Sequence, residues 1–316
     1  MKKKQHLLVI ALICSSIVMA QGDGPRNLLW GPKGASAFIP KWMHLTQNIT
    51  PGNVLITDAD ITIDVFPLTL VHNINIGGNF AQIMISAIPG SASGSIDDSQ
   101  GVPIPETTTS GFSDGFIGFK YGLINTPALN AIEFSQHKQK FSMFLYTRLW
   151  YSGTYDENKP LNLGTNRFTF DFGPVANVQF SKNPKRPTTL ESYLGVHLYT
   201  ANNSPSLGTF ADKSQQLPSL VWENHFSHNF TNKLWGAATM RYQYGGALEL
   251  DGVNQNNKLN ILGSDLTVGY QVMPLLAIHT SYGGIITGDN GAKSNMFRVV
   301  LMFTYVNLKK LKAKTN

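Results

Sequence analysis

The chain of 316 residues has little charge, one cysteine and, beyond its first twenty residues, no long apolar run. Charged residues make up 14% of the chain, compared with roughly 25% in soluble domains. A helix that crosses a bilayer needs about 20 predominantly apolar residues, so helical spans are excluded after the leader. The mean hydropathy of −0.09 is close to neutral. Low charge with neutral hydropathy instead favours strands in which polar and apolar residues alternate.

The first twenty residues have the pattern of an export signal. Residues 2–4 are lysines, residues 7–18 form an apolar run, and the expected cleavage site follows Ala20. Cys14, the only cysteine, lies inside this run, so the predicted mature chain has no thiol. An exported protein without cysteine has no disulfides. It must therefore be held together by backbone hydrogen bonds and packing.

The positive charge of the chain is concentrated at its two ends. The formal net charge is +6, and it falls by three when the leading lysines are removed. Much of the remainder lies in a basic tail at residues 307–316, in Lys309, Lys310, Lys312 and Lys314. Nucleic-acid binding requires a basic stripe or patch on the folded domain. The sequence has no such stripe, and we expect no nucleic-acid partner.

The stretch from Asn166 to Phe180 is the clearest strand in the chain. Successive side chains of a strand point to opposite faces, and its two faces differ in polarity: Phe168, Phe170, Phe172, Ala176, Val178 and Phe180 against Arg167, Thr169, Asp171, Asn177 and Gln179. It exceeds the roughly 5–6 residues of a typical strand. Two interpretations follow, a long strand of a soluble sandwich or a membrane crossing. Pro174 cannot donate to a strand ladder, so we expect a bulge or bend beside Gly173.

The same alternation recurs along the chain and predicts an all-β, antiparallel transmembrane β-barrel of about 12 strands. Short and long connections alternate, as they do in outer-membrane barrels. The first predicted strand, 53–65, has an acidic face that we place inside. The predicted domains are the signal peptide 1–20, an irregular N-terminal segment 21–52, the barrel 53–306 and the basic tail 307–316. The runs are 53–65, 66–76, 79–88, 111–121, 141–151, 166–180, 190–200, 217–230, 234–244, 259–271, 275–286 and 295–306.

The two faces of these strands favour the barrel over the sandwich. One face carries apolar and aromatic residues, among them Trp222, Phe226, Tyr242, Leu266 and Phe303, which suit lipid and its interfaces. Closure removes the sheet edges that lipid cannot hydrogen-bond. The other face is expected to line the lumen, and its charged or ionisable members are Arg148, Arg167, Asp171, Glu191, His197, Glu223, His225, Arg241, Asp265, His279 and Arg298.

Two roles are open for the residues of the lumen. The charged side chains either pair across strands and fill the barrel, or line a selective path, since rings of charge filter permeants in pores. The aromatic residues expected inside either stack against solutes or pack a closed lumen; they are Phe112, Phe116, Phe144, Tyr146, Trp150, Tyr193 and Tyr199. Trp30 and Trp42, in the N-terminal segment, are candidates for a plug inside the barrel, as in larger outer-membrane transporters.

Catalytic and metal chemistry have weaker support. Ser227 and His225 share one face of a strand, but His228 points the other way, so the third group that orients a catalytic base is missing. The inward histidines lie on separate strands without a metal-binding spacing. Asp251, Asn254 and Asn256 in the 246–258 loop could bind calcium, but the pattern that they start lacks the central Gly and terminal Glu of a dedicated calcium loop. We therefore assign no catalytic residue, no metal and no cofactor.

Several short motifs occur in one order over nearly the whole predicted mature chain. They are Gly24-Pro25-Arg26 with Gly31-Pro32-Lys33-Gly34, Pro127-Ala128-Leu129 with Glu133-Phe134, Gly153-Thr154-Tyr155-Asp156, Asn162-Leu163-Gly164-Thr165-Asn166-Arg167, Leu190-Glu191 with Thr200-Ala201-Asn202, and Tyr244-Gly245-Gly246. This order resembles the outer-membrane transporter family labelled "putative MetA-pathway of phenol degradation". The resemblance implies a β-barrel associated with uptake of aromatic or other hydrophobic compounds.

The sequence therefore predicts an outer-membrane channel for passive uptake of small hydrophobic solutes. Its expected partners are outer-membrane lipid and lipopolysaccharide, those solutes and the barrel-assembly machinery. One alternative is a structural or adhesion barrel that displays the long loops 89–110, 201–216 and 246–258. A second alternative is an outer-membrane esterase that uses Ser227.

Overall fold

The computed structural model describes residues 22–48, 59–96, 104–138, 140–181, 183, 186–206, 209, 211–289 and 293–306. The predicted signal peptide 1–20 and the basic tail 307–316 lie outside the described residues. None of the described helices has the length and hydropathy needed to cross a bilayer.

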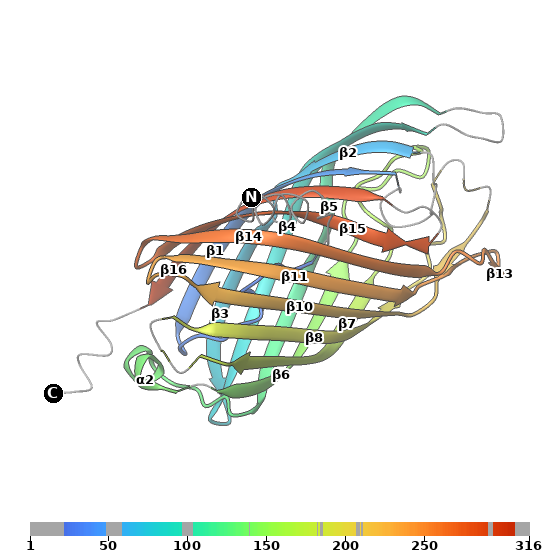
Figure 1. Ribbon diagram of the computed structural model, residues 1–316. Coiled ribbons are helices and arrows are strands. Elements are labelled where there is room, and N and C mark those ends of the chain that lie inside the picture. The colour runs from blue at the N-terminus through green and yellow to red at the C-terminus, as the bar shows by residue number, and fades with distance from the viewer. Residues whose placement is uncertain are drawn as a thin grey trace, which may run out of the picture.

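The molecule is a closed antiparallel barrel of long, tilted strands (Figure 1). Alternating polar and apolar residues form these strands because one face meets the lumen and the other the surroundings. The barrel strands are β1 (Ala35–Gln47), β2 (Ala59–Val65), β3 (Leu68–Ile76), β4 (Asn79–Ile96), β5 (Ile104–Ile124), β6 (Phe141–Tyr151), β7 (Thr169–Gln179), β8 (Thr188–Tyr199), β10 (Ser219–Asn229), β11 (Leu234–Gly245), β14 (Leu259–Met273), β15 (Leu276–Gly288) and β16 (Ser294–Val306).

Closure is made by β1, which pairs with β16 in the register Ala35↔Val306 to Gln47↔Ser294. Both β2 and β3 pair with β1 and with β4, so they are two halves of one strand interrupted at Phe66 and Pro67. A proline cannot donate a backbone hydrogen bond to a strand ladder. It is tolerated here because the ladder is interrupted at this position. The barrel thus has 12 strands, which confirms the predicted fold class.

The predicted number of strands is right, although two assignments of residue ranges to strands are wrong. The runs 53–65 and 66–76 were predicted as separate strands, but their described parts form one. The twelfth strand is β1, which lies in the segment predicted to be irregular, so the barrel begins at Ala35 and not at residue 53. Pro40 and several small residues weaken the alternation of β1, and its pairing with β16 supplies what the local pattern lacks.

The two ends of the barrel differ. At one end the connections are short turns, together with the helix α2 (Ala131–Gln136), which begins at the cap residue Asn130. The final strand β16 ends on the same side as α2 (Figure 1). At the other end the loops form a small sheet of β9 (Ser214–Gln216), β12 (Leu248–Leu250) and β13 (Val253–Asn254).

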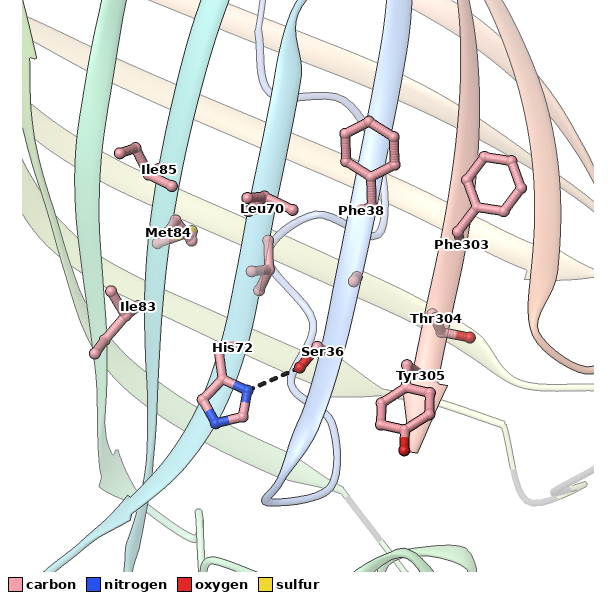
Figure 2. Close-up of a pocket in the computed structure, with 12 residues that line it drawn as sticks. Ser36, Phe38, Leu70, His72, Ile83, Met84, Ile85, Phe303, Thr304 and Tyr305 are labelled. Carbon is pink, nitrogen blue, oxygen red and sulfur yellow. Dashed lines mark hydrogen bonds between the residues drawn. The ribbon is translucent and has the colours of Figure 1, made fainter. Parts of the chain in front are cut away.

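The outer wall is mainly apolar. Phe168, Phe170 and Phe180 of the longest predicted strand are 52%, 44% and 57% exposed, which places this row on the outside. A groove crosses the wall over β16, β1, β3 and β4; it is lined by outward-facing apolar side chains and by Ser36 and His72, whose side chains are 2.8 Å apart (Figure 2). A closed barrel with an apolar outer wall is the form in which strands span membranes.

The acidic face of β2 points outward, contrary to the prediction. Ile61, Ile63 and Val65 are buried inside, whereas Asp64 on the outside bonds to Trp42 Nε1 at 3.0 Å. The polarity of this strand reverses because its end packs on an apolar cluster in the mouth of the barrel. The cluster consists of Leu45, Ile61, Ile63, Val65, Ala92, Leu161, Leu163 and Met296.

No bulge is present at Gly173 and Pro174. The register between β7 and β8 is the same on both sides of this pair, at Phe172↔Val196 and at Val175↔Tyr193. The two residues drop out of that ladder but remain paired with β6. A Cβ on Gly173 would lie 2.0 Å from the carbonyl oxygen of Leu194. The glycine therefore permits a close approach of β7 to β8, and Pro174 faces outward.

Candidate site in the barrel lumen

The structure places all the ionisable residues predicted for the lumen on the inner wall. Most are buried, and His197 and Arg241 are partly exposed to the interior, with side-chain exposures of 15% and 18%. The buried members are Arg148, Arg167, Asp171, Glu191, Glu223, His225, Asp265, His279 and Arg298. Because they come from neighbouring strands at matching heights, they form clusters and not a single ring.

The first cluster is centred on Arg148. Its Nε donates to Asp171 Oδ2 at 2.7 Å, and its Nη1 donates to Asp23 Oδ1 at 2.6 Å. The hydroxyl of Tyr193 also donates to Asp171, and His197 Nε2 lies 3.3 Å from the same carboxylate. Charge-assisted bonds of this kind are stronger than neutral ones. They link β6, β7 and β8 across the inner wall.

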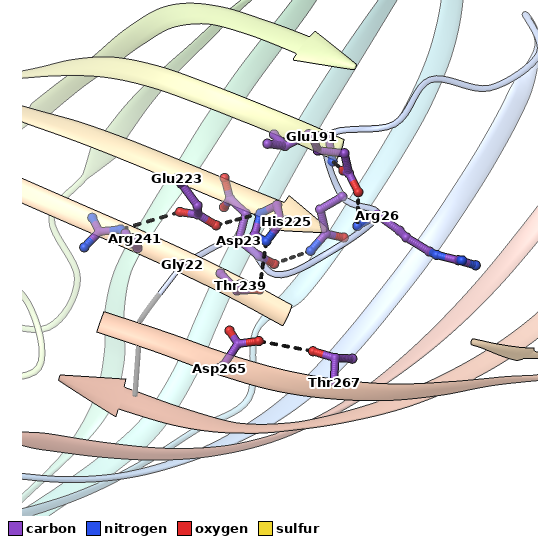
Figure 3. Close-up of polar contacts among 12 residues, drawn as sticks. Gly22, Asp23, Arg26, Glu191, Glu223, His225, Thr239, Arg241, Asp265 and Thr267 are labelled. Carbon is purple, nitrogen blue, oxygen red and sulfur yellow. Dashed lines mark hydrogen bonds and ion pairs between the residues drawn. The ribbon is translucent and has the colours of Figure 1, made fainter. Parts of the chain in front are cut away.

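The second cluster surrounds Glu223 (Figure 3). His225 Nε2 lies 2.9 Å and Arg241 Nε 3.5 Å from its carboxylate. His225 Nδ1 is 2.9 Å from Thr239 Oγ1, so both ring nitrogens face a partner. A third group pairs Arg298 with Asp265 at 3.6 Å. These contacts are those expected if the charges pair and fill the lumen.

Residues 22–34 of the N-terminal segment run through the lumen. The Glu191 carboxylate accepts from the backbone N–H groups of Arg26, at 2.8 Å, and Leu28, at 3.1 Å. Lys120 Nζ donates to the carbonyl oxygens of Leu28 and Leu29, at 3.2 and 2.8 Å. Side chains on two different walls of the barrel thus hold the backbone of this segment.

The segment is also held by its side chains. Trp30 is 6% exposed and lies edge-on to Phe134 and Phe80, with ring centroids 5.0 and 5.8 Å apart. The guanidinium of Arg26 lies over the ring of Trp235, 3.9 Å from its centroid. Burial lowers the pKa of Arg26 to about 10, and the Glu191 carboxylate partly opposes that shift. Arg26 is therefore charged at neutral pH.

Trp42 is not part of this plug. It lies on β1 with 39% of its surface exposed, and it packs against Phe297 on the outer wall. The prediction failed because Trp42 was assigned to an irregular segment, in which the direction of a side chain cannot be read. On a strand, an even-numbered residue next to inward-facing Lys41 must point outward.

The predicted inner aromatic residues are inside, with one exception. Phe144, Tyr146 and Tyr193 are buried, and the structure places Phe116, Trp150 and Tyr199 along the interior cavities. The prediction that Phe112 lies inside is wrong, since this residue is 53% exposed. The register of β5 against β4 shifts between Ser113 and Phe116, so residues of the same parity on the two sides of this shift face opposite ways.

Two cavities lie inside the barrel, on either side of residues 22–32. The cavity toward the end with the short turns has a volume of about 360 Å³, and its walls are mainly apolar, including Leu29, Ile39, Val71 and Met84. The cavity toward the long loops has a volume of about 470 Å³ and is lined by Arg148, Arg241 and Arg298 among others. Lys41, Asp23, Thr69 and Phe116 line both. Volumes of this size fall within the roughly 300–1,000 Å³ of small-molecule pockets.

A profile of the family described as "Putative MetA-pathway of phenol degradation" matches residues 45–301. The chain belongs to this family. The resemblance inferred from the ordered motifs is therefore confirmed. Among curated proteins, no match is found.

The barrel of this family member is similar to solved outer-membrane structures. The COG4313 outer membrane channel from Pseudomonas putida F1 is 18% identical with a TM-score of 0.72, covering 90% of this chain and 100% of that one. Two autotransporter domains also match. The beta domain of the Bordetella autotransporter Brka is 8% identical with a TM-score of 0.51, covering 86% of this chain and 100% of that one. The transport unit of the autotransporter AIDA-I from Escherichia coli is 10% identical with a TM-score of 0.51, covering 90% of this chain and 93% of that one. At these identities the similarity establishes the fold.

The family motifs meet in space. Arg26 of the first motif bonds to Glu191 of the fifth. At the mouth, Asn166 Nδ2 donates to Asn202 Oδ1 at 2.8 Å, and Asn202 Nδ2 donates to the Tyr155 hydroxyl at 3.2 Å. Motifs far apart in the sequence therefore come together in two places. One is where residues 22–34 are attached to the barrel wall, and the other is where the loop 152–168 is held at the mouth.

Among the described residues, sequence reasoning missed several charged residues of the lumen, among them Asp23, Arg26, Lys41, Asp114 and Lys120. Asp23, Arg26 and Lys41 lie in the stretch that was predicted to be irregular, where no alternation assigns an inner face. Lys120 lies in a glycine-rich strand predicted only weakly, yet it is fully buried. The available signal was its spacing of four residues from Phe116, which places both side chains on the same face of a strand.

Ser227 is buried on the inner wall, as its strand position implies. His225, its candidate base, already faces Glu223 and Thr239, and His228 lies near Thr188, with Nδ1 2.8 Å from its hydroxyl. In the 246–258 loop, the Asp251 carboxylate accepts from Lys213 N at 2.9 Å. These side chains have structural contacts that account for their positions.

Proposed function

We propose that this protein is an outer-membrane channel for the passive uptake of small hydrophobic compounds, aromatic compounds among them. The observation that carries the proposal is the pair of interior cavities with aromatic and apolar walls, separated by residues 22–32. Family membership adds a link to phenol degradation. The proposal includes export by the signal peptide, insertion by the barrel-assembly machinery and an outer wall in contact with lipid and lipopolysaccharide.

The physical basis of such a channel is solvation. An apolar solute crosses the polar surface of the outer membrane poorly, and aromatic walls inside a barrel replace water around it. Phe116 lines both cavities and its ring lies 4.8 Å from that of Trp150. The step between the cavities requires displacement of residues 22–32, which act as a gate in this proposal.

Transport is tested with the purified protein in liposomes. We expect toluene-like solutes to enter protein-containing liposomes faster than empty ones, and faster than sugar-like solutes of similar size. The transport proposal fails if neither class of solute enters faster than into empty liposomes.

A second candidate function rests on the ordered loops. Parts of 201–216 and 246–258 form the sheet β9–β12–β13, which gives this end a defined surface. If display of this surface is the function, deletion of the β12–β13 hairpin abolishes adhesion to cells. A channel with the same deletion retains solute entry into liposomes.

A further inference from the structure

Lys41 differs from every other residue on the inner face of β1. The inward row is Ala35, Ala37, Ile39, Lys41, Met43, Leu45 and Gln47, and all of these line one or both cavities. Lys41 is thus a single cation in the middle of a mainly apolar row. It lies between the two cavities, because it lines both.

The ammonium group of Lys41 has no hydrogen-bond or ion-pair partner among the residues that the structure describes. The charged groups that act on it most are two cations, Arg298 and Arg148, and two acids, Asp23 and Glu223. Both acids are already engaged, Asp23 with Arg148 at 2.6 Å and Glu223 with His225 at 2.9 Å. The interior therefore holds a cation whose neighbouring anions are committed elsewhere.

The other lysine and the arginines of the lumen differ in this respect. Lys120 donates to two backbone carbonyl oxygens. Arg148, Arg241 and Arg298 each face a carboxylate. A charge taken from water without a partner is costly, so the walls supply partners for these residues. Lys41 instead points into open cavity space, where a ligand can supply one.

We propose that Lys41 is the binding site for the carboxylate of a small amphiphilic monoanion, such as an aromatic monocarboxylate, whose apolar body lies beside Phe116. Phe116 is the aromatic residue that lines both cavities together with Lys41. Around it, Ile39, Val71 and Met84 offer apolar surface. This inference rests on the proposed function, since it names the class of solute that such a channel retains between its two cavities.

The same geometry argues for one carboxylate and against two. Of the charged groups around Lys41, the acids Asp23 and Glu223 would repel a second carboxylate on the same ring, and the cations Arg148 and Arg298 are already paired with Asp171 and Asp265. Like charges at close range disfavour binding. A neutral aromatic hydrocarbon meets the apolar walls but leaves the ammonium of Lys41 without a partner, and a neutral amide offers it only an uncharged acceptor, whose hydrogen bond is weaker than that of a carboxylate.

The test compares three ligands of one ring size on the purified full-length protein in detergent: benzoate, neutral benzamide and the dianion terephthalate. Calorimetry is expected to give benzoate an affinity at least about 10-fold above that of benzamide and of terephthalate, the size of a charge-assisted hydrogen bond. Lys41→Met, which keeps the length of the side chain, is expected to remove this preference. Lys41→Arg is expected to retain most of it.

Lys138→Met is the matched control, because it makes the same change at an exposed residue beside α2. It should keep the wild-type preference. Equal binding of benzoate and benzamide to the wild type overturns the inference, as does a preference that survives in Lys41→Met. If Lys41→Met does not fold, as judged by heat-modifiable gel mobility, Lys41→Gln is measured instead.

These outcomes are separate from those of the transport test. Entry of toluene-like solutes into liposomes without any preference for benzoate refutes the role of Lys41 and leaves the channel. Preferential binding of benzoate without solute entry refutes the channel and leaves a binding site.

Discussion

At the scale of single residues, Arg148 of the inner wall faces two acids. Arg148 is 6% exposed and contacts both Asp171 on the adjacent strand and Asp23 of the N-terminal segment. Asp171 is fully buried. Removing one partner of a buried pair leaves the other charge without compensation, and that loss exceeds the net gain from forming the pair.

We therefore expect Arg148→Ala to destabilise the barrel by about 3–5 kcal/mol. The measurement is the melting temperature from circular dichroism or from heat-modifiable mobility. Arg186→Ala, at an exposed turn position, is the control and should melt like the wild type. An unchanged melting temperature for Arg148→Ala would show that the Arg148 cluster contributes nothing to stability.

Arg167→Ala is a second test at the scale of single residues. It distinguishes a lumen that is filled by paired charges from a lumen whose charges line a selective path. The Arg167 guanidinium lies 4.9 Å from the ring centroid of Tyr199 and donates to Gln216. Paired filling predicts a lower melting temperature, since a buried network is broken. Altered solute permeation with unchanged melting would favour the selective path.

At the scale of elements, the N-terminal segment is held mainly by polar bonds to its backbone. Glu191 alone satisfies two backbone N–H groups of the segment. Such anchoring needs no particular side chain on the segment at those positions, so the sequence of the segment does not reveal it. It also means that a single wall residue, Glu191, supplies two of the bonds that hold the segment.

Glu191→Ala is expected to loosen residues 22–32 and to speed entry of small sugars into liposomes. The reason is that two buried N–H groups lose their acceptor, at a cost of about 1–3 kcal/mol each. Glu249→Ala, in the loop sheet and away from the lumen, should leave entry unchanged. If Glu191→Ala liposomes behave like the wild type, residues 22–32 are not the gate.

The approach of β7 to β8 at Gly173 gives a second prediction for an element. Gly173→Ala places a Cβ 2.0 Å from the carbonyl oxygen of Leu194, and we expect overpacking to cost about 1–3 kcal/mol of stability. Pro174→Ala changes an exposed residue on the outer wall and should have a small effect. A thermal melt of both variants compares them directly, and equal melting would contradict the close approach.

At the scale of the whole molecule, the outer wall has an apolar part and a polar part. The wall is apolar over most of the barrel, whereas the outer face of β2 carries Asp60, Thr62 and Asp64. The interior is reversed in the same place, where the mouth cluster is apolar. This division is expected if the β2 end of the barrel stands in water above the lipid.

Leu266→Arg, near the middle of β14, should destabilise the folded protein in lipid by about 2–4 kcal/mol, as arginine does at a bilayer midplane. Thr62→Arg on β2 should have little effect. Equilibrium unfolding in phospholipid vesicles measures both. Equal costs at the two positions would contradict the division of the wall.

The sequence by itself determined the closed antiparallel barrel, its family and the inward direction of the charged residues assigned to the lumen. It did so because a period of two along a long strand records which side meets lipid. The predicted number of 12 strands was right because two wrong strand assignments cancel. Only the tertiary structure decided what lies beside what. It showed that β1 closes the barrel, that β2 reverses its faces at the mouth, and that Glu191 and Lys120 hold residues 22–34. Those features depend on contacts between distant segments, and such contacts leave no period in the sequence.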